Sequence, residues 1–158
     1  MRKTGDEPIM YKGKDTGFYL RDFWGWGFSD LLDNTLRGSY AEFIVAVALG
    51  LDFSKTRVNW DPWDLMFGDG QAEIHVEVKS CSYLQVWEQS HPSAIKFSIR
   101  PAIRWTATDG WTGEPRRQSD VYVFCLFTET DSTAADPMRL DSWVFYVLPT
   151  KTLDERCG

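Results

Sequence analysis

Cysteine and histidine are scarce in this chain. Its 158 residues contain three cysteines, Cys81, Cys125 and Cys157, and two histidines, His75 and His91. An odd number of cysteines without paired spacing argues against a disulfide framework and is typical of a reducing cytosol. No Cys-x-x-Cys pair occurs, so a zinc site of the Cys/His type is not expected. We assign no catalytic role to either histidine.

Long apolar runs are also absent. The longest, residues 44–49 and 121–127, are much shorter than the roughly 20 residues that span a bilayer. The chain begins Met-Arg-Lys-Thr-Gly-Asp-Glu, and no apolar segment follows the basic pair, so no secretory signal is expected. We therefore expect a cytoplasmic protein that has no membrane contact.

An excess of positive charge is missing too. Lysine and arginine number 17 against 23 aspartates and glutamates, which gives a net charge of −6 and a pI near 4.9. A protein that coats nucleic acid needs a surplus of basic residues, so this class is excluded. An enzyme with a local basic groove stays compatible, and a carboxylate-rich metal site would add to the acidity. The chain is also compatible with being part of a longer protein.

Residues that can form a hydrophobic core are plentiful in this chain. Hydrophobic residues make up 43% of the chain and aromatic residues 15%, which is enough for a folded domain. The length fits one domain, residues 1–158. Residues 1–17 are polar and are expected to form a flexible arm. The aromatic residues of segment 18–28 are expected to pack on one side of the core, with stacking on nucleic-acid bases as the alternative.

Residues 34–50 predict the clearest helix. Apolar residues recur at intervals of three and four, namely Leu36, Tyr40, Phe43, Ile44, Val47 and Leu51. Gly50 is a helix stop signal. A helix that begins at Ser39 would make Ser39-Tyr40-Ala41-Glu42 a capping box and Glu42 a structural residue. The periodicity favours a start near Asn34, which would place Glu42 in mid-helix.

Apolar patterns predict five strands, at residues 56–60, 63–67, 72–79, 121–127 and 143–148. Gly68-Asp69-Gly70 is a turn signal between the second and the third. Strands 121–127 and 143–148 are continuous apolar runs, typical of strands buried on both faces. Buried strands after a long crossover predict an α/β fold with a mixed central sheet, an antiparallel meander plus a parallel strand, flanked by helices.

The crossover itself, residues 84–118, is harder to interpret. Residues 83–89 predict a helical turn, in which Tyr83 and Trp87 are expected to pack rather than to stack on bases. Residues 95–99 alternate apolar and polar and predict an extended segment that ends at Pro101. Residues 106–119 contain glycine and proline and predict a loop.

The tripeptide Glu77-Val78-Lys79 is the first candidate for chemistry. On a strand, residues two apart share a face, so the carboxylate and the ammonium lie side by side. A hairpin through residues 68–70 would bring Asp64 opposite Glu77. Two carboxylates can hold a hard divalent cation together with waters and a substrate phosphate. A lysine beside them can orient water, and the cation stabilises charge on the phosphate oxygens.

A plainer interpretation is the solvent face of an amphipathic strand. A Glu-x-Lys tripeptide is expected at about 0.4% of positions, or roughly once in two chains of this length. An acidic interaction domain of this kind predicts that Glu77 and Lys79 are exposed and that Glu42 folds back on Ser39. Asp64 at the head of an apolar strand and Glu42 within an apolar helix favour a site, since a carboxylate that faces a core is costly unless paired or bound to metal.

The ordered set Glu42, Asp64, Glu77 and Lys79 resembles the PD-(D/E)XK nuclease superfamily. Its restriction-endonuclease-like core runs helix, three-strand meander, crossover helix and strand, which corresponds to residues 34–127 here. The resemblance implies that Asp64 and Glu77 bind Mg²⁺, for which Mn²⁺ would substitute. It implies that Glu42 supports the metal site and that Lys79 positions the attacking water.

The resemblance also extends to weaker positions. It implies that the Val78 carbonyl joins the metal shell. The family's Pro-Asp pair is replaced here by Pro62-Trp63-Asp64, so Asp61 stays an alternative to Asp64 as the ligand. Several members carry a glutamine after the lysine, a place that Gln85 could fill, and Ser80 is a further accessory candidate. For both, an ordinary solvated side chain is the alternative.

Contacts to DNA phosphates are predicted for five basic residues, Lys96, Arg100, Arg104, Arg116 and Arg117. The first three are spaced by four and share a face of either a strand or a helix, and the last two precede the strand at 121–127. A solvated charged surface is the alternative for each.

The sequence thus predicts a Mg²⁺-dependent endonuclease of restriction, defence or repair type, with DNA as partner. The resemblance makes a homodimer possible, which the Trp-rich N-terminal segment could serve, or a separate recognition subunit. A catalytically inactive nuclease-fold module is the alternative function.

Overall fold

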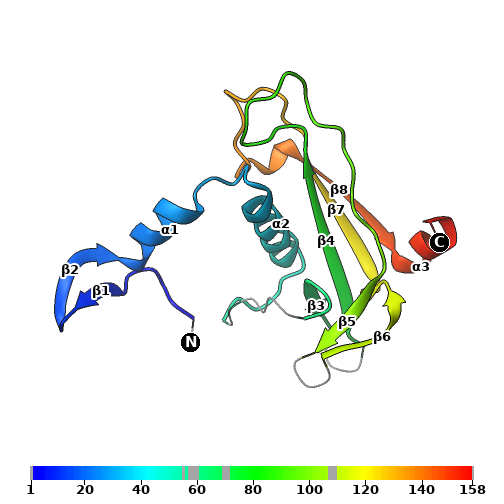
Figure 1. Cartoon of the computed structure of the whole chain (residues 1–158), viewed down its shortest axis with the longest axis horizontal. Helices are drawn as coiled ribbons and strands as arrows, with labels where there is room; N and C mark the ends of the chain where they lie inside the picture. The colour runs from blue at the N-terminus through cyan, green and yellow to red at the C-terminus, as the bar shows by residue number, and fades with distance from the viewer. Residues whose placement is uncertain (1, 55, 57–60, 69–71, 107–109, 158) are drawn as a thin grey trace.

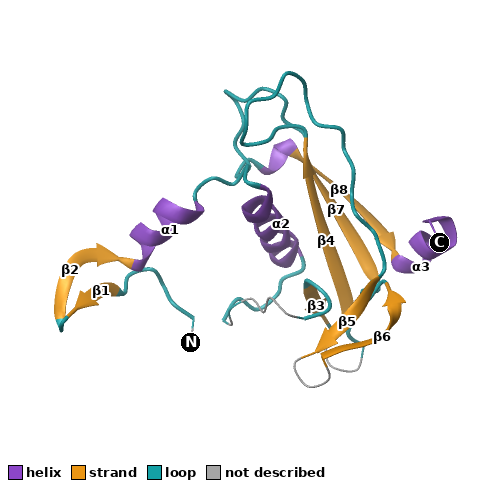
Figure 2. Ribbon diagram, viewed as in Figure 1, coloured by secondary structure: helices purple, strands orange, loops and turns teal. Residues whose placement is uncertain are grey.

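The computed structural model describes residues 2–54, 56, 61–68, 72–106 and 110–157 (Figure 1). The chain consists of a body with a four-stranded sheet and an N-terminal arm that projects from it (Figures 1 and 2). In the described part of the chain, no helix is both long and apolar enough to cross a membrane.

The central sheet has the order β3-β4-β7-β8, with β3 at Leu65–Phe67, β4 at Ile74–Ser82, β7 at Val121–Phe127 and β8 at Trp143–Pro149. Strands β4 and β7 are parallel, whereas the other two pairs are antiparallel. The prediction of an α/β fold with a mixed sheet is confirmed. Of the predicted strand 56–60, residues 57–60 lie outside the described residues.

Helix α2 (Asn34–Ala48) lies on one face of the sheet. The Asp33 side chain caps it by accepting from the backbone N–H of Thr35 and Leu36, at 2.9 and 3.1 Å. At the other end, Gly50 adopts φ +66° and the Leu51 N–H donates to the Ala46 carbonyl at 3.0 Å, a Schellman motif. The predicted start near Asn34 is confirmed, and the alternative start at Ser39 is wrong.

The core forms on both faces of the sheet. On the α2 face it comprises Ala41, Ile44, Val45, Val76, Val78, Val123, Cys125, Phe127 and Trp143. On the opposite face, Tyr122 and Phe124 pack with Leu153 of helix α3 (Thr150–Cys157). Because β4 alternates, Val76 and Val78 face α2 while Glu77 and Lys79 face the other way.

Strand β8 differs from its prediction. Only Trp143 is buried, and the rest of this apolar strand is exposed, because β8 is the edge of the sheet and no described element covers its outer side. A short 3₁₀ turn at Leu140–Ser142 leads into it.

The crossover from β4 to β7 contains no helix in the described residues, so the predicted helical turn at 83–89 is wrong. Side chains close this loop instead, since the Gln85 N–H donates to Gln89 Oε1 at 2.7 Å. The alternation of residues 95–99 is confirmed as a burial pattern, and the Phe97 ring lies 5.0 Å from Phe124.

The predicted loop at 106–119 is wrong in part, because β5 (Ala102–Thr106) and β6 (Gly110–Arg116) form an antiparallel hairpin. The glycine and proline that suggested a loop are accommodated on an exposed two-stranded ribbon. Gly113 takes φ +85°, and Pro115 needs no partner on an edge.

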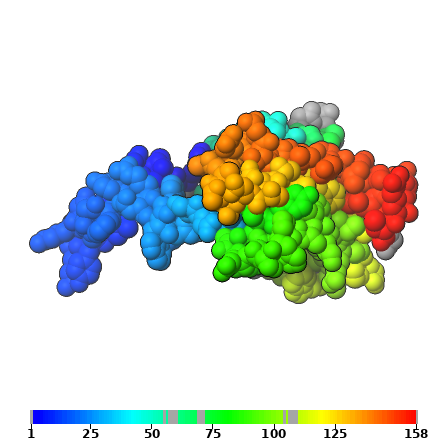
Figure 3. Space-filling model, turned by 90° about the horizontal axis from the view of Figure 1, so that it is seen from above, coloured from blue at the N-terminus to red at the C-terminus, as the bar shows by residue number. Residues whose placement is uncertain are grey.

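The arm comprises the hairpin β1 (Pro8–Tyr11) and β2 (Lys14–Tyr19), followed by helix α1 (Leu20–Phe28). The space-filling view shows the arm as a projection from the body (Figure 3). No residue of α1 is buried, so the prediction that segment 18–28 packs on the core is wrong.

Candidate active site

Asp64 lies immediately before β3, at the open edge of β4. Its N–H donates to the Val76 carbonyl at 3.1 Å, and its Oδ2 accepts from the Val78 N–H at 2.8 Å. The side chain thus takes over the pairing with β4 where the β3 backbone ladder stops. Since the N–H and carbonyl of one strand residue point the same way, the Val78 carbonyl faces this edge as well.

The hairpin that positions Asp64 depends on Gly68. This residue follows β3 with φ +141°, and a Cβ there would collide with the Ala72 carbonyl oxygen. Only glycine fits such a backbone approach.

Among the described carboxylates, Asp64 has a pKa that is raised well above its ordinary value. Burial and, after it, the charges of Glu77 and Glu42 together raise its pKa to about 6, against the opposing effects of the Val78 N–H and Lys79. Asp64 is thus partly removed from water and lies near two further carboxylates, and both effects disfavour its charged form. Such a perturbed group marks a candidate functional site.

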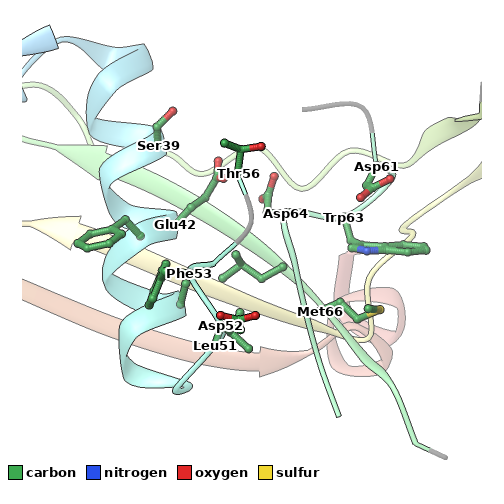
Figure 4. Close-up of a pocket in the computed structure, with 13 residues that line it drawn as sticks. Ser39, Glu42, Leu51, Asp52, Phe53, Thr56, Asp61, Trp63, Asp64 and Met66 are labelled. Atoms are coloured by element: carbon green, nitrogen blue, oxygen red, sulfur yellow. The ribbon is translucent and has the colours of Figure 1, made fainter. Parts of the chain in front are cut away.

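Glu42 and Asp64 line a common cavity of about 290 Å³ beneath α2. Their carboxylates point toward one another, with Thr56 close by (Figure 4). Glu42 is only 8% exposed. Asp61 lines the far end of the same cavity, away from Glu42. Asp64, rather than Asp61, is thus the carboxylate that faces Glu42.

Glu77 and Lys79 lie on the other face of β4 and form an ion pair. Their side chains are 19% and 31% exposed, so neither is a freely solvated group. The buried Ser119 donates its Oγ–H to Glu77 Oε2 at 3.2 Å. Thr150 holds Ser119 in turn by donating to its carbonyl.

The neighbouring Tyr122 belongs to the same environment. Burial raises its pKa to about 12, and the charge of Glu77 contributes to the rise. The phenol therefore stays neutral at physiological pH and adds no charge beside Glu77.

Asp64 consequently stands at the sheet edge between the Glu42 cavity and the Glu77–Lys79 pair. In the part of the chain that the structure describes, no three His, Cys, Asp or Glu side chains are grouped closely enough to hold a metal ion by themselves. Mg²⁺ commonly uses one or two carboxylates and completes its shell with waters and substrate phosphate. The donors at this edge are all oxygens, which suits a hard cation of that kind.

The accessory candidates make contacts within the fold. Ser80 Oγ accepts from Arg37 Nε at 3.2 Å, and this buried arginine anchors α2 to β4. Gln85 Nε2 donates to the Ser82 carbonyl and to Ser93 Oγ, both at 3.3 Å. Its buried Oε1 has no partner among the described residues.

The five basic candidates differ in their exposure and in their contacts. Lys96 and Arg100 are exposed on the extended segment, and Arg116 is exposed on β6. Arg117 is occupied within the fold, because its buried side chain donates to the Ile99 carbonyl at 2.8 Å and pairs with Asp154. The Arg104 side chain lies outside the described residues.

Ser119 and Tyr122 are the site neighbours that sequence analysis missed. They lie 42 and 45 positions after Glu77, and only the parallel pairing of β4 with β7 brings them together. A polar residue before a buried strand is too common a pattern to have identified Ser119.

Comparison with protein-family models, with curated proteins and with solved structures finds no match to this chain.

Proposed function

We propose that this chain is a Mg²⁺-dependent nuclease of the PD-(D/E)XK type that hydrolyses phosphodiester bonds in DNA. The observation that carries the proposal is Asp64, whose pKa is raised to about 6 by burial and by two further carboxylates. Those two are Glu77 and Glu42, the residues that the resemblance also selects. A divalent cation at this edge would relieve their mutual repulsion.

In this proposal Asp64 and Glu77 supply the carboxylate ligands, and the Val78 carbonyl shares their edge of β4. Mg²⁺, when bound, stabilises the negative charge that develops on the phosphate oxygens. Glu42 faces Asp64 across the cavity (Figure 4) and supports the metal site. Lys79 lies against Glu77 and orients the attacking water.

Two observations argue against the acidic interaction domain. Helix α2 is capped by Asp33, and Glu42 sits in mid-helix rather than folded back on Ser39. Glu77 and Lys79 are both partly buried, whereas a solvent-facing strand predicts full exposure.

The experiment is a substrate panel. Labelled single-stranded DNA, duplex DNA and RNA are incubated with the protein in Mg²⁺, in Mn²⁺ and in EDTA, and thermal unfolding is measured in the same buffers. We expect DNA cleavage in both metals and none in EDTA. Metal at ten times its Kd should stabilise the fold by about 1.4 kcal/mol.

The other outcomes separate the alternatives. Absence of both cleavage and metal stabilisation would favour the catalytically inactive module. Stabilisation without cleavage would support the metal site and point to a missing partner, such as a recognition subunit. Cleavage of RNA alone would retain the chemistry and reject DNA as substrate.

A further inference from the structure

The N-terminal arm, residues 2–28, is held together by its own contacts. The Tyr19 N–H donates to Asp22 Oδ2 at 2.7 Å at the start of α1, and Arg21 pairs with Asp6. Its link to the body includes the Arg2 guanidinium, which donates to the Phe53 carbonyl. The arm thus has a defined shape but buries none of its helix.

Such an arm is not expected to be stable on its own. A two-stranded hairpin is marginal in water, and isolated helices shorter than about 12–15 residues are marginal as well. Helix α1 has nine residues. Some further surface must therefore stabilise the arm.

The arm exposes an unusual amount of aromatic surface. Five aromatic side chains are between 39% and 85% exposed, namely Phe18, Phe23, Trp24, Trp26 and Phe28. At roughly 200 Å² per aromatic side chain, they leave about 550 Å² accessible. Phe23 contacts both Trp26 and Phe28, and exposed apolar patches of several hundred Å² are often functional in soluble proteins.

The body carries a second apolar area, the α2–β8 surface, formed by Tyr40, Phe43, Val47, Phe145 and Val147. Ring contacts join its two elements: Phe43 lies 6.3 Å from Tyr40, Tyr40 lies 6.4 Å from Trp143, and Trp143 lies 6.3 Å from Phe145. Phe145 and Val147 face α2, since they pair with the core residues Cys125 and Val123.

Strand β8 also lacks the protection that exposed edges normally have. Its sequence Trp-Val-Phe-Tyr-Val-Leu-Pro contains no charged residue. Natural proteins guard free edges with charges, bulges or a covering element. An uncharged apolar edge therefore indicates that another surface covers β8.

A second copy of the chain fits both areas. Two arms exchanged reciprocally would bury about 1,100 Å² of their own aromatic surface and a similar area beneath them, which reaches the 1,200–2,000 Å² of stable interfaces. Charge favours the same pairing: residues 2–28 hold five basic and four acidic residues, net +1, while residues 29–158 hold 12 and 19, net −7. A net charge of only +1 offers little neutralisation of nucleic-acid phosphates.

We propose that the arm of each chain packs on the α2–β8 surface of a second copy and that the chain forms a symmetric dimer. A two-fold axis makes the exchange self-complementary, since each chain offers one arm and one receiving surface. This inference does not depend on the nuclease proposal, because it is read out by mass and not by cleavage; Phe43 of the receiving surface also lines the Glu42–Asp64 cavity.

The test is sedimentation equilibrium of the full chain with three variants. Trp26→Glu alters the arm at a side chain that is 85% exposed, and Val147→Glu alters the receiving surface at one that is 62% exposed. Trp111→Glu, on the β5–β6 hairpin and 73% exposed, is the matched control. All three positions are exposed, and circular dichroism verifies that each variant is folded.

We expect a dimer for the wild type and for Trp111→Glu. Trp26→Glu and Val147→Glu should each raise the dimer dissociation constant at least tenfold, as loss of an interface anchor does. A wild-type chain that stays monomeric at 100 micromolar, or a dimer that neither variant weakens, would overturn the proposal. So would a monomer whose Trp26→Glu variant loses only binding to single-stranded DNA, which would identify the arm as a base-stacking element.

Discussion

The carboxyl group of Asp64 makes a pH-dependent contribution to stability. Its pKa is raised from 3.8 to about 6, so between these values the folded state holds a proton that the unfolded state releases. Stability therefore falls as the pH rises from about 4 to about 6, and the cost persists above that range. Two pKa units correspond to about 3 kcal/mol at most.

Asp64→Asn removes this cost, because the amide oxygen can still accept from the Val78 N–H. We expect the variant to gain about 1–3 kcal/mol over the wild type at pH 7.5 and nothing at pH 4, measured by urea unfolding in EDTA. Asp61→Asn, at the other end of the cavity, is the control. Equal stability of Asp64→Asn and wild type at pH 7.5 would contradict the assigned burial and repulsion.

Ser119 is predicted to position the Glu77 carboxylate. Ser119→Ala removes the donor at 3.2 Å from Glu77 Oε2, and loss of a hydrogen bond to a charged group costs about 1.5–3 kcal/mol. We expect the Mg²⁺ concentration for half-maximal cleavage to rise roughly tenfold, while the KM for DNA stays unchanged. The exposed Ser98→Ala is the control. An unchanged Mg²⁺ dependence would show that Ser119 serves the fold alone.

Single residues were predictable from the sequence to different degrees. Glu42, Asp64, Glu77 and Lys79 could be selected because their order along the chain resembles a nuclease motif, and the structure places Asp64 between the other three. Arg117 could not be judged, because its partner Asp154 lies 37 positions later and is brought near only by α3. Ser119 carried no local signal at all.

At the scale of elements, helix α2 is predicted to depend on its Asp33 cap. Asp33→Ala leaves the Thr35 and Leu36 N–H groups without their acceptor and should cost about 1 kcal/mol. Ser39→Ala, in mid-helix, should change stability by less than about 0.5 kcal/mol, since alanine is the better helix former. Chemical denaturation measures both. A larger loss for Ser39→Ala would restore the alternative helix start and make Glu42 a cap residue.

Elements with strong periodicity followed from the sequence, and those set by long-range packing did not. Helix α2 was predicted closely from its apolar residues at intervals of three and four, and strand β7 from its continuous apolar run. Hairpin β5–β6 was missed, since glycine and proline on an exposed ribbon give the same pattern as a loop. The burial of β8 was overestimated because its apolar run indicates a covered strand, whereas the single chain leaves it at an edge.

At the scale of the whole molecule, the arm and the body differ in their charge. The arm is nearly neutral and aromatic, whereas the body is strongly acidic and gathers three carboxylates around one sheet edge. A cation at that edge would lower the repulsion within the body, and a second copy would cover the arm. The metal-site proposal thus follows from the repulsion among the carboxylates. The dimer proposal follows from the aromatic surface that a single chain leaves exposed.

The most direct test of the central claim is cleavage of supercoiled plasmid in Mg²⁺ by the wild type and three variants. Glu77→Ala and Lys79→Ala alter the site, while Glu73→Ala removes an exposed carboxylate just before β4 and serves as control. Nicking by the wild type and Glu73→Ala, with at least a hundredfold loss in Glu77→Ala and Lys79→Ala, is the predicted result. Nicking that survives in both site variants, or that is absent from the wild type in Mg²⁺ and Mn²⁺ alike, would contradict it.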